Sequence, residues 1–125
     1  MNFPITCLLI DHNKETHRFF SEALQHLSEN VAIVIAQDDQ SATTILRKHY
    51  GPILIFFNPD LPGIDEHKFI LHLKKEIGKR RIPIIIYSDT YDESRILKAK
   101  KLGALDFFKQ TNNICELEYF LKKYL

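Results

Sequence analysis

Five short apolar runs, separated by stretches with helical spacing, constrain the fold of this 125-residue chain more than any other feature. The runs are Ile5–Ile10, Val31–Ala36, Ile53–Phe57, Ile82–Tyr87 and Leu105–Phe108. Such runs are typical of strands buried on both faces of a parallel sheet. Between them, apolar side chains recur every three or four residues, which predicts helices. We therefore expect an α/β fold with a five-stranded parallel sheet in the order 2-1-3-4-5 and helices on both faces.

Composition argues against several classes of protein. The net charge of +1 provides no bulk field that would recruit nucleic acid or an anionic membrane. No apolar run approaches the ~20 residues of a membrane-spanning helix, and the first residues lack the basic region of a secretory signal. The two cysteines, Cys7 and Cys115, have no paired spacing and are interpreted as buried thiols. We expect a single cytoplasmic domain over residues 1–125, without an output domain, a nucleic-acid partner or a membrane contact.

Polar side chains follow the ends of the predicted strands. Asp11 and His12 follow the first strand, Asn58 and Asp60 the third, Ser88 the fourth, and Gln110 the fifth. In an open α/β sheet, ligands bind where the carboxyl ends of the strands meet at the switch point. The residues at these strand ends include no Gly-rich phosphate loop and no nucleophile–base pair of the hydrolase kind. The sequence therefore predicts one polar site centred on Asn58.

The same stretches resemble the receiver domain of two-component response regulators, which has a flavodoxin-like fold. The resemblance runs from Ile5 to Leu125 and depends on four motifs at matching intervals. These motifs are Leu8-Leu9-Ile10-Asp11, Leu61-Pro62-Gly63-Ile64-Asp65, Ile82-Pro83-Ile84-Ile85-Ile86-Tyr87-Ser88 and Lys101-Leu102-Gly103-Ala104-Leu105-Asp106.

The resemblance implies a role for each position of the site. Receivers of this family hold Mg²⁺ and form an aspartyl phosphate at the strand ends. By this resemblance the acidic pair falls on Asp11 and His12, the phosphoacceptor on Asn58, the loop on Asp60, Pro62 and Gly63, the hydroxyl on Ser88, the lysine on Gln110, and the switch aromatic on Phe107. Thr111 stands where the family usually has proline.

Three of these positions depart from the family in the same chemical direction. The amide of Asn58 cannot replace a carboxylate nucleophile. His12 replaces a carboxylate with an imidazole, although Mg²⁺ prefers hard anionic oxygens. Gln110 is neutral where a cation is expected. We therefore predict no catalytic residue, no enzymatic activity, no cofactor, and weak or absent Mg²⁺ binding.

Several alternatives stay open at this point. Asn58 could be an engineered substitution, Lys109 could take the lysine role, and Asp60 or His12 could accept a phosphoryl group instead. A flavodoxin-like ligand binder is a further class. The residues also suggest a hypothesis in which His12 cross-links Asp11, Asn58 and Asp60 in place of a metal. Because a cis bond before Thr111 would cost about 3 kcal/mol without proline, we predict a trans Gln110–Thr111 peptide.

The predicted function is a signalling module of a phosphorelay pathway that works by protein contact without Asp phosphorylation. Its implied partners are a histidine kinase, a phosphotransfer protein or an output protein, and a homodimer through the fourth helix, fifth strand and fifth helix is another option. That face could include Tyr91, Lys98, Lys109, Glu116, Tyr119 and Lys122. A basic cluster at Lys74, Lys75, Lys79, Arg80 and Arg81 is explained by the preference of cations for helix C-termini. The remaining histidines, including His72, are expected to be surface residues.

Overall fold

The computed structural model describes residues 5–28, 30–90 and 92–125, and its sheet confirms the predicted architecture. Five parallel strands are arranged in the order β2-β1-β3-β4-β5. They are β1 (Ile5–Ile10), β2 (Val31–Ala36), β3 (Ile53–Phe57), β4 (Ile84–Ser88) and β5 (Asp106–Lys109). Every residue of β3 and β4 is buried, as expected for central strands covered by helices on both faces.

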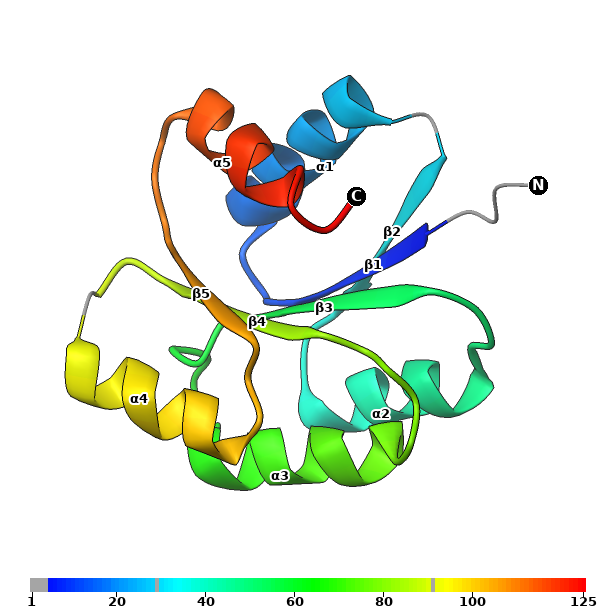
Figure 1. The fold of residues 1–125 in the computed structure, drawn as a ribbon, viewed down its shortest axis with the longest axis vertical. Coiled ribbons are helices and arrows are strands. Elements are labelled where there is room, and N and C mark those ends of the chain that lie inside the picture. Colours follow the sequence, from blue (N-terminus) through cyan, green and yellow to red (C-terminus); the bar gives the residue numbers. More distant parts are fainter. Residues whose placement is uncertain (1–4, 29, 91) are drawn as a thin grey trace.

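Helices cover both faces of the sheet (Figure 1). They are α1 (Lys14–Leu27), α2 (Asp39–Lys48), α3 (Glu66–Ile77), α4 (Glu93–Leu102) and α5 (Ile114–Leu121). The helices α1 and α5 lie side by side on one face, and α2, α3 and α4 cover the other. Each helix begins after an Asn or Asp whose side chain accepts a hydrogen bond from the first turn, because those N–H groups have no partner within the helix. No helix in the described ranges is long and apolar enough to cross a membrane.

Two strands differ in their bounds from the sequence prediction. Strand β4 begins at Ile84 rather than at Ile82 and continues through Ser88. Pro83 explains the later start, since proline has no N–H to donate to the sheet; its carbonyl still accepts a hydrogen bond from Ile55. Strand β5 begins one residue later than predicted, and Leu105 is left 57% exposed at its edge.

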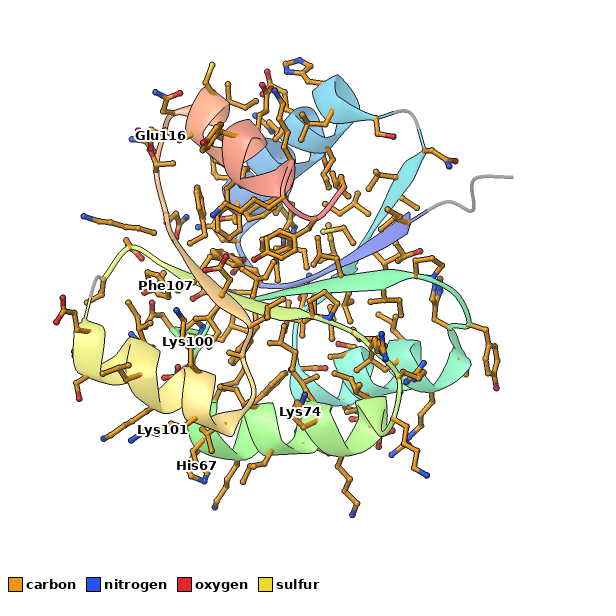
Figure 2. All side chains as sticks on the ribbon, viewed as in Figure 1. His67, Lys74, Lys100, Lys101, Phe107 and Glu116 are labelled. Atoms are coloured by element: carbon orange, nitrogen blue, oxygen red, sulfur yellow. The ribbon has the colours of Figure 1, made fainter. Side chains whose placement is uncertain are left out.

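The alternation of side chains along the strands divides the apolar core into two layers, both filled by side chains (Figure 2). Leu8 and Ile10 of β1 face α2, α3 and α4, while Cys7 and Leu9 face α1 and α5. All four side chains are fully buried. Each fully buried aliphatic side chain of this kind contributes about 1.5–3 kcal/mol of transfer free energy. The core therefore fixes the strand register, because a slip by one residue would exchange the two layers.

The two cysteines lie in different environments. Cys7 is completely buried in β1, and burial raises the pKa of its thiol to about 12. Cys115 is exposed on α5, so the prediction that both thiols are buried is wrong for this residue. The reason is its place in the helix: Cys115 lies two residues before the fully buried Leu117, and residues two apart point to nearly opposite sides.

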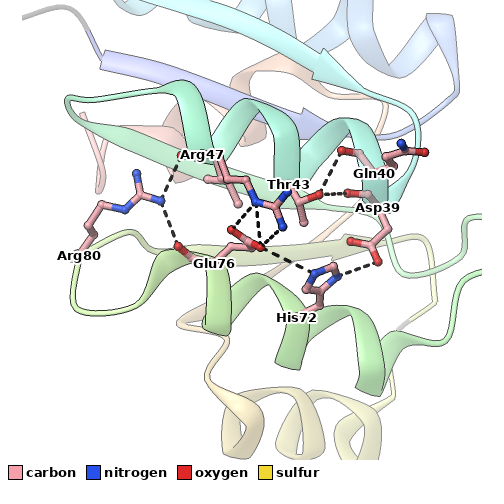
Figure 3. A network of polar contacts seen from close by, with 8 residues as sticks. Asp39, Gln40, Thr43, Arg47, His72, Glu76 and Arg80 are labelled. Atoms are coloured by element: carbon pink, nitrogen blue, oxygen red, sulfur yellow. Dashed lines mark hydrogen bonds and ion pairs between the residues drawn. The ribbon is translucent and has the colours of Figure 1, made fainter.

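Polar contacts connect α2 to α3 at both ends of α2 (Figure 3). Arg47 donates to the Glu76 carboxylate over 2.7 Å. The Arg80 guanidinium donates to the Leu46 carbonyl over 3.1 Å and so satisfies one of the last carbonyls of α2. His72, expected to be a plain surface residue, lies 2.9 Å from Asp39 across the same helix pair.

Candidate functional site

The carboxyl ends of β1, β3 and β4 place the predicted site residues at one edge of the sheet. Asp11 directly follows β1, Asn58 directly follows β3, and Ser88 ends β4. The backbone keeps these ends together, since the Asn58 N–H donates to the Ile10 carbonyl over 3.1 Å and the Gln110 N–H donates to the Ser88 carbonyl over 2.8 Å. The site is therefore positioned by the same ladder that builds the sheet.

Asp11 is fully buried and bound by two donors. Its Oδ1 accepts the Asn13 N–H over 3.1 Å, and its Oδ2 accepts the Tyr87 hydroxyl over 2.5 Å. Burial raises the pKa of Tyr87, and the Asp11 charge raises it further, so the phenol stays a hydrogen-bond donor. The Tyr87 ring packs on Phe20, with ring centroids 5.1 Å apart. Both oxygens of Asp11 are thus already engaged within the protein.

Sequence reasoning missed Tyr87, although a signal for it exists. Tyr87 is the only tyrosine in a strand of otherwise aliphatic residues and Ser88, and a buried tyrosine normally needs a partner for its hydroxyl. Side chains alternate along a strand, so Tyr87 points toward the α1 and α5 layer while Ile86 points toward the other. Asp11 is the buried acceptor on that side.

His12 does not make the cross-link that the sequence suggested. Its Nδ1 lies 3.4 Å from Asp11 Oδ1, and its side chain is 54% exposed. Within the described ranges, His12 has no hydrogen bond or ion pair with Asn58 or Asp60. The hypothesis is wrong because the Asp60 carboxylate points to Ser88 and Arg95 instead.

Asn58 shapes the loop that follows β3. Its side-chain Oδ1 accepts the Asp60 N–H over 2.9 Å, which is the geometry of an Asx turn. Further along the loop, the Ile64 N–H donates to the Leu61 carbonyl over 3.3 Å across Pro62 and Gly63. Gly63 has a φ of 76°, as the third position of a type II turn requires. The amide of Asn58 is therefore a structural acceptor in a tightly folded loop.

Asp60 is the centre of the polar contacts on the exposed side of the site. Its Oδ2 accepts the Ser88 hydroxyl over 2.6 Å, and its Oδ1 accepts Nη2 of Arg95 over 2.9 Å. Burial acts to raise the pKa of Asp60, but the hydrogen bonds from Ser88 and Arg95, with the charge of Arg95, outweigh it. The pKa of Asp60 therefore lies below its usual value. The carboxylate joins the β3–α3 loop to β4 and α4.

Arg95 extends this cluster to α3 and is the second residue that sequence reasoning missed. Its Nε donates to Glu66 Oε2 over 2.9 Å. Asp92 caps α4 and so places Arg95 in the first turn of the helix. A cation there is opposed by the helix dipole, which is a sequence signal that Arg95 needs a specific anionic partner. We call Asp60, Ser88, Arg95 and Glu66 the Arg95 cluster.

In the described part of the chain, the side chains that follow β5 form no hydrogen bond or ion pair with the carboxylates or the guanidinium of the Arg95 cluster, although the Gln110 N–H donates to the Ser88 carbonyl. Gln110 Nε2 donates to Thr16 Oγ1 on α1 over 3.4 Å. The described peptide bonds include no cis bond, so Gln110–Thr111 is trans, as predicted. Phe107 is half-buried and packs against the core layer of α2, α3 and α4 (Figure 2). Lys109 is exposed and forms no ion pair with another described residue.

The donors at this edge do not fit a hard divalent cation. Mg²⁺ requires near-octahedral oxygen ligands, usually from one or two carboxylates with waters. Here Asp11 is bound by Asn13 and Tyr87, and Asp60 is bound by Ser88 and Arg95. Among the residues that the structure describes, no group of three or more His, Cys, Asp or Glu side chains could hold a metal ion.

Comparisons with known proteins find receivers. No family model matches the chain. The response regulator Rcp1 of Synechocystis is 21% identical over 122 residues, which span 93% of this chain and 83% of Rcp1. The chemotaxis protein CheY4 of Vibrio cholerae superposes with a TM-score of 0.81 at 16% identity, over 99% of this chain and 100% of that one. The receiver domain of the Pseudomonas aeruginosa sensor histidine kinase PA1611, which holds a magnesium ion in its active site cleft, superposes with a TM-score of 0.76 at 18% identity, over 97% of each chain.

These likenesses span nearly the whole chain rather than one motif. The strand order and the helices on both faces are those of a flavodoxin-like receiver. The sequence likeness to Rcp1 covers the same extent. Asp11, Asn58 and Gln110 directly follow β1, β3 and β5, and Ser88 is the last residue of β4. In fold and in sequence, the chain resembles a receiver domain of the response-regulator type found in two-component systems.

Proposed function

We propose that this receiver domain works in a two-component pathway by protein contact, without phosphorylation of an aspartate and without catalytic turnover. The observation that carries the proposal is the state of the acceptor position. Asn58 stands there, and its side-chain oxygen closes the loop on the Asp60 N–H. An amide whose nitrogen lone pair is delocalised does not attack a phosphoryl group.

The surroundings of Asn58 support the same proposal. An acyl phosphate would need a metal and a cation to balance its charge. The oxygens of Asp11 are bound by Tyr87 and Asn13, and the neutral Gln110 donates to Thr16. We therefore propose that Mg²⁺ binds weakly or not at all, in contrast to the PA1611 receiver with its coordinated magnesium ion.

The Arg95 cluster gives the loop a fixed position that needs no phosphate. The Asp60 carboxylate takes the Ser88 hydroxyl and the Arg95 guanidinium at once. Arg95 also holds Glu66 at the start of α3. Loop, β4, α3 and α4 are thus joined by charged hydrogen bonds, which are about twice as strong as neutral ones. A module held in one conformation in this way would present a constant surface to its partners.

The surface most suited to partners is formed by α4, β5 and α5. Leu97, Leu105 and Tyr119 are exposed there by 59%, 57% and 75%, and the charged residues Lys98, Lys109, Glu116 and Lys122 are exposed with them. Tyr91, also expected on this face, lies outside the described residues. We propose a histidine kinase, a phosphotransfer protein or an output protein as partner, or a second copy of the chain, in the cytoplasm.

Intact-mass measurement after incubation with acetyl phosphate and Mg²⁺ tests the proposal. We expect no phosphoryl adduct on the natural chain. The matched control is the triple variant Asn58→Asp, His12→Asp, Gln110→Lys, which restores the acidic pair, acceptor and lysine together and is expected to gain the adduct. An adduct on the natural chain, lost in Asp60→Asn or in His12→Ala, would instead identify a working acceptor that uses an unconventional residue.

A further inference from the structure

We propose that a basic hollow at the amino-terminal edge of β4 and β5 binds an acidic peptide segment of a partner protein that carries an apolar side chain. This surface lies at the opposite end of the sheet from Asn58 and does not depend on the proposed function. The hollow has a volume of about 430 Å³. It is lined by Lys74, Arg80, Arg81, Ile82, Pro83, Gly103 and Leu105.

The cations around the hollow are not neutralised within the described parts of the chain. Residues 74–81 contain five Lys or Arg side chains and one carboxylate, Glu76. Glu76 is bound by Arg47 of α2 over 2.7 Å (Figure 3). Lys74 and Arg81 have no ion pair with another described residue. Because the whole chain carries a net charge of only +1, this excess is local, and it would attract an anionic partner.

The helix dipole explains only part of this arrangement. Lys74 lies in the last turn of α3, and Lys100 and Lys101 lie in the last turn of α4, where a cation is worth about 0.3–1 kcal/mol. Figure 2 shows the three lysines on the side of the molecule that α3 and α4 form. Arg81, however, follows α3 by four residues and gains nothing from the dipole. Like charges placed close together lower stability. The helix dipole therefore does not by itself account for the position of Arg81 beside these lysines.

Lys74 is held in place by the backbone of the neighbouring helix end. Gly103 ends α4 with a φ of 123°. A Cβ added to Gly103 would lie 2.8 Å from Cε of Lys74 and 2.9 Å from its Cδ. The lysine stem therefore packs on the bare glycine. Restricting a lysine side chain before binding reduces the entropy that binding must remove.

Arg80 has a different task from the other cations. Its guanidinium donates to the carbonyls of Leu46, Glu76 and His49 over 3.1–3.2 Å. It forms a fixed wall of the hollow rather than a free charge. Lys74 and Arg81 are therefore the cations available to a ligand carboxylate.

The floor of the hollow selects a peptide over other polyanions. Ile82 is 9% exposed, and Leu105 is 57% exposed at the rim. An apolar floor beside cations suits a segment that combines carboxylates with one apolar side chain. Single-stranded nucleic acid instead stacks its bases on aromatic side chains, and the lining contains no aromatic side chain.

Fluorescence polarisation with a labelled peptide tests the proposal. The probe is a peptide of glutamates with one central leucine, at low salt. We expect saturable binding, weakened by serine in place of the leucine and by rising salt. Lys74→Glu with Arg81→Glu should weaken it by about tenfold, the factor that corresponds to 1.4 kcal/mol. The matched control, Lys14→Glu with Arg18→Glu, makes the same charge change at two exposed positions of α1 and should leave the affinity unchanged.

The remaining outcomes decide against the proposal. Equal weakening by both double variants would mean non-specific charge attraction. Tighter binding of a single-stranded oligodeoxynucleotide or of phosphatidylserine vesicles would identify a different partner. Circular dichroism of each variant separates loss of binding from loss of fold. The double variant Lys74→Gln with Arg81→Gln removes the two charges without reversing them and serves as a second test of binding. Acetyl phosphate labelling is unaffected by either result, so this inference and the proposed function can fail separately.

Discussion

Replacing Arg95 by alanine should loosen the connection between the β3–α3 loop and the two helices beside it. Arg95 is the cation that joins Asp60 to Glu66, through bonds of 2.9 Å to each. Its side chain is 27% exposed, Glu66 is 23% exposed and Asp60 is 40% exposed. The variant would leave two carboxylates close together with no cation between them.

The expected loss follows from these exposures. The Asp60 pair is more than a third exposed, so solvent screens it and it contributes about 0.5 kcal/mol. The Arg95–Glu66 pair is less exposed, and Oε1 of Glu66 is buried without a hydrogen-bond partner among the described residues. This pair contributes about 1 kcal/mol to the free energy of unfolding. Arg95→Ala should therefore lower the free energy of unfolding by about 1–2 kcal/mol, which at this size lowers Tm by about 4–8 °C.

Urea denaturation followed by circular dichroism measures this loss. Lys98→Ala is the matched control, because Lys98 is exposed on the same helix and has no ion pair with a described residue. Asp60 has a lowered pKa in the folded state, so its contribution is present above its unfolded pKa of about 3.9 and is lost as the pH falls through the folded value. The gap between natural chain and variant should narrow at acid pH. Equal losses in the free energy of unfolding for Arg95→Ala and Lys98→Ala would contradict the prediction. So would fully additive losses for Arg95→Ala and Asp60→Asn, because residues that act through one cluster should be coupled.

Three further predictions concern Tyr87, the two cysteines and Gly103. Tyr87→Phe should lower the free energy of unfolding by about 1.5–3 kcal/mol, because it removes a hydrogen bond to a buried carboxylate. Thermal melts check this against Tyr124→Phe, which removes the part-buried hydrogen bond from Tyr124 to Asp106; a smaller loss for Tyr87→Phe would contradict it. Alkylation of the native chain should modify Cys115 and spare Cys7, whose thiol is buried with a pKa of about 12; peptide mapping reads the ratio, and equal labelling would refute it. Gly103→Ala should lower stability by about 1–3 kcal/mol, since the new Cβ meets the Lys74 stem at a positive φ; an unchanged urea midpoint would disprove this.

The fold was predictable because it depends on local patterns. Continuous apolar runs marked β3 and β4 as central strands, and helical spacing placed the helices between strands. The sheet order then followed from the common topology of such folds. The bounds of β4 were missed at Pro83, because the missing N–H acts on ladder pairing rather than on hydrophobicity.

The contacts of the site were less predictable than its location. The strand order alone brings Asp11, Asn58 and Ser88 to one edge. Tyr87 meets Asp11 across 76 residues, and Arg95 meets Asp60 across 35. No periodicity encodes such pairs. The sequence-based hypothesis gave His12 the contact with the Asp60 carboxylate that Arg95 makes. The hypothesis considered only residues at the strand ends and not the first turn of α4.

The two parts of the site, around Asp11 and around Asp60, balance their negative charges by different means. Asp11 is a buried anion supported by neutral donors, the Tyr87 hydroxyl and a backbone N–H. Asp60 and Glu66 share one cation, Arg95. The Asp11 and Asp60 carboxylates thus each accept two hydrogen bonds from groups of the protein. A carboxylate at position 58 would add a further negative charge between these groups, whereas the amide of Asn58 adds none and still closes the loop. The neutral amide is therefore compatible with the arrangement that we propose, in which no metal ion balances the charge.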